Sequence, residues 1–212
     1  AGGFVSAPSA NTSGRPSPTT AEHVVHDLNG KIDMIIDGGA VDIGVESTIL
    51  DMTVSPPMIL RPGAVTAEMF AEVIGPVDID RTILKAESGV RPKAPGMKYR
   101  HYAPKARLMI VEGDIREEIL AIRQLAYAAH RRKKKSGIIA TNETLPFYNY
   151  GIVKNAGTRE NEKTIARNLY RVLREFDQED VEVIYSESFA VQGIGQAVMN
   201  RLEKAAGHQK IT

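Results

Sequence analysis

The sequence contains no cysteine, and this absence excludes disulfide bonds and every mechanism that relies on a thiolate. It has no apolar run near the roughly 18 residues that a membrane-spanning helix requires, and no segment has the features of a signal peptide. Charge of one sign is not in excess, because the formal net charge is +1. Global charge therefore gives no argument for binding nucleic acid or a membrane. We expect a cytoplasmic protein without membrane contact.

The 212 residues are enough for one large domain or two small ones, and their 42% hydrophobic and 25% charged content is typical of a globular protein. The sequence begins with Ala1-Gly2-Gly3 and has no initiator methionine there. Residues 3–7 have the pattern of a short strand that leads into a polar turn. We therefore expect the chain to be part of a longer polypeptide.

Short apolar runs and capping signals describe residues 1–75. Thr19 and Glu22 have the spacing of a capping box, which predicts a helix that ends near Asp27. Thr66 is a second capping residue and predicts a helix to about Ile74. Runs bounded by Gly, Pro or Asp predict strands at Met34–Ile36, Ser47–Met52 and Met58–Leu60.

Residues 76–104 hold four prolines and little periodicity, which is typical of a connector between domains. Within them, Met97 to Tyr102 is a cluster of basic and aromatic residues, and this cluster is unusual for a passive linker. Its aromatic rings are suited to stacking on a base or to covering a pocket as a lid. Both interpretations, passive connector and lid, remain open on composition.

Residues 105–212 alternate strands with helices, and this alternation predicts a mostly parallel, Rossmann-like sheet. Asp114 and Glu117 form a capping-box pair at the start of one helix, and Gly207 ends the last one. The predicted strands are Leu108–Val111, Gly137–Ala140, Gly151–Val153 and Val181–Tyr185. The predicted helices begin at Asp114, Thr158 and Ile194.

Three polar groups in the first 75 residues could carry chemistry. Residues 9–19 combine five hydroxyl side chains with Asn11 and Arg15 just before a helix N-terminus, a setting that suits phosphate or carboxylate. Glu46-Ser47-Thr48 enters an otherwise apolar strand, and Arg61 ends the next one, where a guanidinium can bind phosphate. Each group has an alternative without function. Residues 9–19 could be a Ser/Pro-rich turn before a capped helix, Glu46 to Thr48 could be ordinary strand residues, and Arg61 could be a solvated arginine at a strand end.

Other features give weaker signals. Gly193 and Gly195 resemble the start of a dinucleotide fingerprint, but Val198 replaces the third glycine and no 20-residue interval remains for the ribose-binding acid. The alternative is close helix packing or a helix N-cap. The basic run 130–135 could contact tRNA phosphates or could form a solvated helix end. His23 and His26 lack a third ligand, and we predict no metal site.

Taken in order, four segments resemble the YrdC/YwlC family of threonylcarbamoyl-AMP synthases. They are Ser9 to Thr19, Gly44 to Thr48, Leu60-Arg61-Pro62-Gly63 and His101-Tyr102-Ala103-Pro104. The resemblance implies three parts: residues 1–75 as the C-terminal part of a YrdC-like α/β twisted-sheet domain, residues 76–104 as linker and lid, and residues 105–212 as a Rossmann-like domain.

The resemblance also implies an activity. L-threonine, bicarbonate or CO2, and ATP with Mg2+ give threonylcarbamoyl-AMP and pyrophosphate. Partner tRNA-threonylcarbamoyl transferase proteins then modify the adenosine next to the anticodon of tRNA. By the same resemblance, the threonine contacts are Ser9 and Ser47, and the ATP contacts are Asn11, Thr19, Arg61, His101 and Tyr102. No general base is assigned.

One family feature has no match in this sequence. The upstream Lys-x-Arg signature is absent, because Lys31 and Lys98 stand in other contexts. We therefore expect this chain alone to lack part of the catalytic site. The alternatives are a non-catalytic module that binds nucleotide or partner proteins, a binder of double-stranded RNA, and an NAD-dependent enzyme. The near-neutral charge opposes the second, and the incomplete glycine motif opposes the third.

Overall fold

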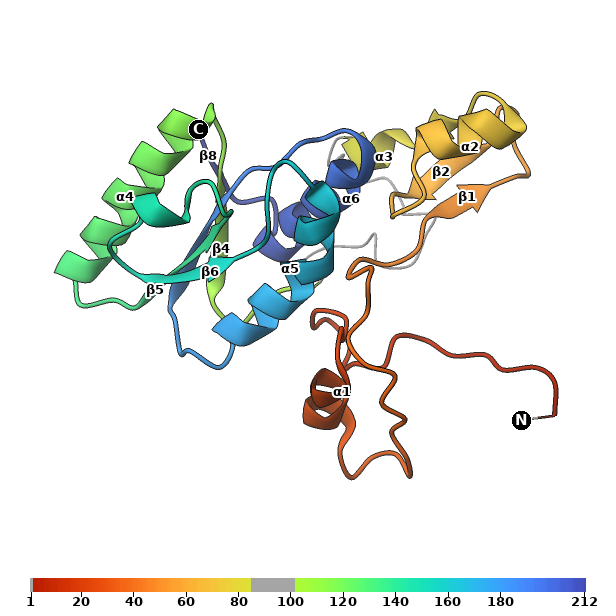
Figure 1. The fold of residues 1–212 in the computed structure, drawn as a ribbon, viewed down its shortest axis with the longest axis horizontal. Helices are drawn as coiled ribbons and strands as arrows, with labels where there is room; N and C mark the ends of the chain where they lie inside the picture. Colours follow the sequence, from red (N-terminus) through yellow and green to blue (C-terminus); the bar gives the residue numbers. More distant parts are fainter. Residues whose placement is uncertain (1, 85–101) are drawn as a thin grey trace.

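The computed structural model describes residues 2–84 and 102–212, which form a small sheet and a larger α/β unit (Figure 1). The elements of the first range are α1 (Ala21–Leu28), β1 (Ile49–Asp51), β2 (Met58–Arg61), α2 (Ala67–Ile74), β3 (Asp78–Ile79) and α3 (Arg81–Leu84). Those of the second are β4 (Arg107–Val111), α4 (Ile115–Arg131), β5 (Ser136–Ala140), the 3-10 helix η1 (Leu145–Phe147), β6 (Ile152–Asn155), α5 (Glu162–Phe176), β7 (Val183–Glu187), α6 (Gly193–Ala206) and β8 (Lys210–Ile211).

The small sheet has the strand order β1-β2-β3, with β1 antiparallel and β3 parallel to β2. The turn after β2 packs closely on the start of β1, because a Cβ at Gly63 would overlap the backbone nitrogen of Thr48. Helix α2 follows this turn and begins as predicted, with the Thr66 side chain accepting a hydrogen bond from the Met69 amide. The sheet and turn thus bring Arg61 and Ser47 to neighbouring positions.

The larger unit confirms the expected parallel sheet. Its five strands have the order β6-β5-β7-β4-β8, and every pairing between them is parallel. Helix α4 begins with the predicted capping box, in which Asp114 and Glu117 bond each other's backbone. Helix α6 ends at Gly207, which adopts the left-handed conformation that favours glycine there.

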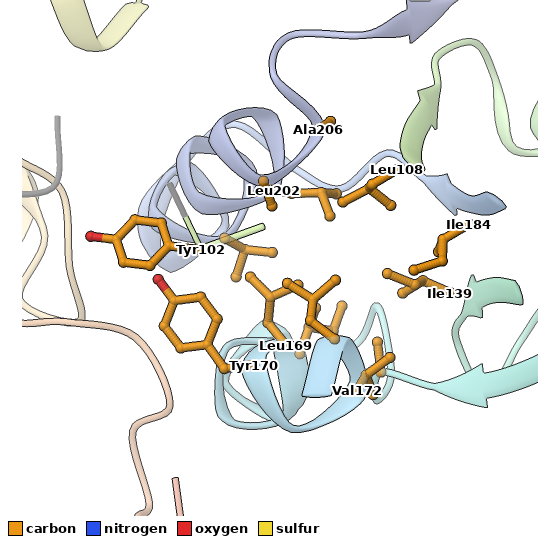
Figure 2. Packing of buried hydrophobic residues seen from close by; sticks show 14 of the residues in the cluster. Tyr102, Leu108, Ile139, Leu169, Tyr170, Val172, Ile184, Leu202 and Ala206 are labelled. Atoms are coloured by element: carbon orange, nitrogen blue, oxygen red, sulfur yellow. The ribbon is translucent and has the colours of Figure 1, made fainter. Parts of the chain in front are cut away.

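Helices cover both faces of this sheet, and side chains alternate between the two faces along each strand. On one face Ile138 of β5 packs with Ile122 of α4. On the other face Ile139 of β5 packs beneath α5 and α6, as Figure 2 shows. Val45 from the first range and Tyr102, which precedes β4, join the second cluster. The N-terminal segments therefore dock on the face that α5 and α6 cover.

Several local predictions differ from the structure. Residues 3–7 and Met34–Ile36 are not strands, and Met34 and Ile36 are 75% and 86% exposed. The described residues supply no partner strand for either run, and a strand depends on pairing for its backbone hydrogen bonds. Residues 78 and 79, within the predicted connector, form β3, which pairs with β2. The short strand β8 has no counterpart among the predictions.

Two predicted helix starts also differ. Helix α1 has Thr20 as its N-cap, and the capping box of Thr19 and Glu22 does not form. The reason is that the Thr19 amide donates to Nδ1 of His23 at 3.1 Å, and its hydroxyl lies 3.3 Å from the same nitrogen. Helix α5 begins after Asn161, whose side chain accepts from the Lys163 amide, and not at Thr158.

Within residues 2–84 and 102–212, no helix is both long enough and apolar enough to cross a membrane.

Candidate functional site

The loop of residues 9–19 runs from an exposed Ser9 to a buried Thr19 just before α1. The Asn11 side-chain amide donates to the carbonyl oxygens of Thr12 and Arg15, at 2.9 and 3.4 Å. Its side-chain oxygen is buried and has no hydrogen-bond partner among the described residues. The loop therefore presents a buried acceptor that the described part of the chain leaves open.

Glu46 is the centre of a hydrogen-bond network that joins this loop to the helices of the larger unit. Its carboxylate accepts from the Ser17 hydroxyl at 2.6 Å, and from Tyr170 on α5 at 2.9 Å. It also accepts from Nε of Arg201 on α6, at 2.8 Å. Burial alone raises the pKa of Glu46, but the Arg201 charge and the hydrogen bonds outweigh it, so the pKa lies below its usual value.

Ser47 and Arg61 contact each other directly beside this network. Nε of Arg61 donates to the Ser47 carbonyl at 3.0 Å, and one terminal nitrogen lies 3.3 Å from the Ser47 hydroxyl. Burial, and then the nearby charge of Arg201, lower the pKa of Arg61. The structure thus brings together a predicted threonine contact and a predicted ATP contact.

Tyr102 lies in the core between the two parts of the chain. It is 3% exposed, and its ring centroid lies 5.2 Å from that of Tyr170. The two hydroxyl groups point to the same side of the core (Figure 2). Burial raises the pKa of Tyr102, and so does the charge of Glu46. His101, the other predicted lid residue, lies outside the described residues.

Basic side chains lie close to Glu46. Arg201 is completely buried, and Lys204 follows one turn later on α6 at 7% exposure. Burial, and then the Arg201 charge, lower the pKa of Lys204 to about 7. With Arg61, three basic side chains thus interact electrostatically with a single carboxylate.

Sequence reasoning did not identify Arg201, Lys204, Tyr170 or Arg174 as site residues. Glu46 and Arg201 are 155 positions apart, and no local pattern relates two such distant residues. One signal was nevertheless present. Arg201 lies on the stripe of Ala197 and Ala205, which are both fully buried, so it interrupts an apolar helix face with a charge.

Thr19 lies instead in an apolar groove of about 510 Å³. Its lining includes Ala10, Val24, Ile36 and Val41 but none of the other predicted site residues. The structure therefore places Thr19 in the groove, apart from the charged network around Glu46. The two lie on neighbouring parts of the chain, because the loop that carries Thr19 also carries Ser17, which donates to Glu46.

The incomplete glycine motif is a packing feature. A Cβ at Gly195 would overlap the Ala190 carbonyl oxygen, which explains the glycine there. The Gly195 amide donates to the Glu162 carboxylate at 3.1 Å. The position that a dinucleotide phosphate takes in the fingerprint is therefore occupied by a side chain of the protein itself.

No group of three His, Asp or Glu side chains suited to a metal ion occurs in the described ranges. A Lys-x-Arg spacing also occurs at Lys105 and Arg107, outside the predicted site. There the Lys105 amide donates to Asp177 at 2.7 Å, and Arg107 donates to Gln209 at 2.6 Å. Lys105 therefore contacts the C-terminal end of α5, and Arg107 contacts the residue before β8. Neither supplies the missing signature.

Comparison with known proteins identifies the family of this chain. The family profile described as "Threonylcarbamoyl-AMP synthase, C-terminal domain" matches residues 65–207, and one described as "Telomere recombination" matches residues 1–63. The chain is 45% identical over 207 residues to the threonylcarbamoyl-AMP synthase of Bacillus subtilis, covering 98% of this chain and 58% of that protein. The Pyrococcus abyssi synthase is likewise 45% identical, with 98% and 59% covered.

Two solved structures of Pyrococcus abyssi Sua5 resemble this chain. One is a variant with a histidine and the adjacent tyrosine changed to alanine, with a TM-score of 0.86, 42% identity, and 96% of this chain and 57% of that one covered. The other is a complex with L-threonine, with a TM-score of 0.85, 42% identity, and 97% and 59% covered. The chain spans somewhat more than half the length of these relatives, and it belongs to the threonylcarbamoyl-AMP synthase family.

Proposed function

We propose that this chain carries one side of a site that makes threonylcarbamoyl-AMP from L-threonine, bicarbonate or CO2, and ATP. The observation that carries the proposal is the direct contact of Arg61 with Ser47, beside the Glu46 carboxylate, with which Arg61, Arg201 and Lys204 interact electrostatically. A guanidinium held in place by the protein suits the phosphates of a nucleotide. The complex of the Pyrococcus abyssi relative with L-threonine supports threonine as a substrate.

The reaction requires charge stabilisation more than a covalent nucleophile. A carbamate oxygen of N-carboxythreonine forms a bond to the α-phosphorus of ATP, while the bond from that phosphorus to the bridging oxygen breaks and pyrophosphate leaves. Negative charge grows on the departing group, so Arg61 is proposed to stabilise it. Ser9 and Ser47 are proposed to bind threonine. Asn11, whose buried side-chain oxygen has no hydrogen-bond partner among the described residues, is proposed to contact the nucleotide.

Mg2+ is proposed to accompany ATP. The Glu46 carboxylate already accepts hydrogen bonds from Ser17, Tyr170 and Arg201. The described residues contain no three-ligand acidic cluster. These residues therefore fit an ion carried by phosphate oxygens, which neutralises phosphate charge, and not an ion enclosed by protein ligands.

The remaining parts of the proposal concern the whole protein. Thr19, His101 and Tyr102 are proposed as further ATP contacts, with His101 and Tyr102 in a segment that shields the labile carbamate from water. An upstream segment is proposed to supply the Lys-x-Arg signature. The product would pass to tRNA-threonylcarbamoyl transferase proteins in the cytoplasm for modification of tRNA.

The test is pyrophosphate release with L-threonine, bicarbonate and Mg-ATP. Two polypeptides are compared: this chain alone, and this chain preceded by the upstream segment of its Bacillus subtilis relative. We expect threonine-dependent release from the fusion and little from the chain alone. Full activity of the chain alone would overturn the need for an upstream segment. Nucleotide binding without any turnover by the fusion would favour the non-catalytic module instead.

A further inference from the structure

We propose that α5 and α6 hold two segments with predicted substrate contacts, the loop of residues 9–19 and residues 44–47, in the conformation that binds substrate. Arg174 and Arg201 are the positioning residues. This inference rests on the proposed function, and it gives residues 105–212 a defined part in the synthase site. Neither arginine contacts a predicted site residue directly. Each acts through a carboxylate, Arg174 through Asp27 and Arg201 through Glu46.

Arg174 connects the polar loop of residues 9–19 to α5 at two points. Its two terminal nitrogens donate to the two carboxylate oxygens of Asp27, at 3.1 and 2.8 Å. Its Nε and one terminal nitrogen also donate to the Pro16 carbonyl oxygen, at 3.0 and 2.6 Å. Asp27 in turn accepts from the Thr12 amide at 3.1 Å. One guanidinium therefore fixes the loop near residue 12 and again at residue 16.

This contact is buried and directional. Arg174 is 6% exposed and Asp27 is 5% exposed. The hydrogen bond from Arg174 lowers the pKa of Asp27 far below its usual value, so the carboxylate is charged at neutral pH. A bidentate guanidinium–carboxylate pair restricts both distance and angle, in a way that a lysine cannot reproduce. The geometry points to precise placement of the loop.

Arg201 makes the corresponding contact with the segment before Ser47. Besides its bond to the Glu46 carboxylate, it donates to the Glu46 carbonyl oxygen at 3.4 Å. Tyr170 and Ser17 complete the set of donors to the same side chain. Glu46 is therefore held from α5 and α6 while it holds the end of the polar loop. Its backbone leads directly into Ser47.

Close packing reinforces these polar contacts. A Cβ at Gly44 would overlap the carbonyl oxygens of Ala166 and Arg167, so the backbone before Glu46 lies directly on α5. Val45 is 6% exposed and belongs to the core cluster under α5 and α6. The contact thus combines steric fit with two buried ion pairs.

The loop itself has few means of keeping its shape. The backbone bonds within residues 9–19 in the structure are Asn11 to Ser9 and Arg15 to Thr12, at 3.0 and 3.2 Å. Irregular backbone with so few internal bonds depends on tertiary contacts for a single conformation. Substrate sites require side chains to be held within a fraction of an ångström. The contacts with Arg174 and Arg201 supply this restraint.

Hydrogen exchange of this chain without ligand tests the restraint directly. Arg174→Lys keeps the charge but lacks the planar guanidinium that bonds both Asp27 oxygens and the Pro16 carbonyl at once. We expect exchange in residues 9–19 to rise about tenfold. The Thr12 amide is the most direct reporter. Arg171→Met is the matched control on α5, because Arg171 bonds Asn168, Glu175 and the Asn155 carbonyl and none of residues 1–75. Exchange in β5 and β7 should not change in either variant.

Kinetics of the fusion with the Bacillus subtilis upstream segment test the consequence for substrates. Arg174→Lys and Tyr170→Phe should lower kcat/KM for ATP and threonine by about ten- to a hundredfold, because a small misplacement of a substrate group has effects of that size. We expect the loss to appear in KM as well as in kcat. Arg171→Met should leave both constants unchanged. Tyr170→Phe removes one hydroxyl only, so it keeps the test informative if Arg174→Lys folds poorly.

The possible outcomes separate this inference from the proposed function. Unchanged exchange in residues 9–19, or an equal rise in β5 and β7, overturns positioning in favour of a general structural role. Normal kcat/KM in variants with a mobile loop overturns it too. If the unaltered fusion neither binds the substrates nor releases pyrophosphate, the proposed function fails, whereas the exchange result still decides whether Arg174 holds the loop.

Discussion

Nε of Arg201 lies 2.8 Å from a carboxylate oxygen of Glu46, although 155 residues separate the two in sequence. The arginine side chain is 1% exposed and the glutamate side chain 15% exposed. This ion pair joins the segment that leads into Ser47 to the last helix of the chain. A buried pair of this kind restricts how the two parts of the molecule can be arranged.

Glu46→Gln should destabilise the protein by about 3 kcal/mol, because it leaves a fully buried guanidinium without its counter-charge. The free energy of unfolding in urea measures this change. The matched control is Glu203→Gln. Glu203 lies on α6, as Arg201 does, and its ion pair with Lys210 is more exposed, so the change should cost less than about 1 kcal/mol.

The double variant Glu46→Gln with Arg201→Met should regain part of the stability lost in Glu46→Gln. It removes the unpaired charge together with its partner, and methionine fills a similar volume. A double variant that is destabilised by the sum of the two single changes would show that the side chains do not interact as a pair.

Lys204→Met should flatten the pH dependence of stability between pH 7 and 10.5. Burial, and then Arg201, lower the pKa of Lys204 from 10.5 to about 7 in the folded protein. In this window the unfolded chain binds more protons than the folded one, so the stability of the unaltered protein rises with pH. One such group contributes a slope of up to about 1.4 kcal/mol per pH unit.

Urea unfolding at intervals between pH 7 and pH 10 measures this slope. Lys135→Met, at an exposed position, is the control and should leave the slope unchanged. An identical slope in Lys204→Met and in the unaltered chain would mean that Lys204 is charged throughout this range.

His23→Gln should remove a loss of stability that the unaltered protein shows below about pH 6.5. Burial, and then Arg174, lower the pKa of His23 below 6.5. The unfolded chain therefore binds the proton first as the pH falls, and stability decreases. Protonation also prevents Nδ1 from accepting the Thr19 amide. Unfolding between pH 5 and 7 measures the effect, and His208→Gln, at an exposed position, should keep the loss.

Gly44→Ala should destabilise the contact between residues 44–47 and α5 by about 1–3 kcal/mol, the usual cost of forcing a methyl group into a packed site. The added carbon would overlap two backbone carbonyl oxygens, which cannot move aside without distorting α5. Gly38→Ala is the control, since a Cβ there meets nothing within 4 Å. Thermal unfolding of the two variants compares them, and equal melting temperatures would contradict the close approach.

The sequence by itself determined the local features that depend on neighbouring residues. The capping box of Asp114 and Glu117, the Thr66 cap, the Gly207 helix end and the alternation that predicts a parallel sheet all appear in the structure. The caps depend on residues a few positions apart, and the alternation depends on the order of elements along the chain. The sequence is therefore enough to predict both. The ordered motifs around Ser9, Ser47 and Arg61 indicated the family in the same way.

Only the tertiary structure decided which of these residues are in contact, and which side chains fix their positions. The Met34–Ile36 run has an apolar pattern but lacks a pairing strand in the described residues. The Thr19 side chain contacts His23 instead of capping its helix. Arg174 and Arg201 reach Asp27 and Glu46 across 147 and 155 positions. Contacts at such separations depend on how the helices pack, and no local periodicity encodes them.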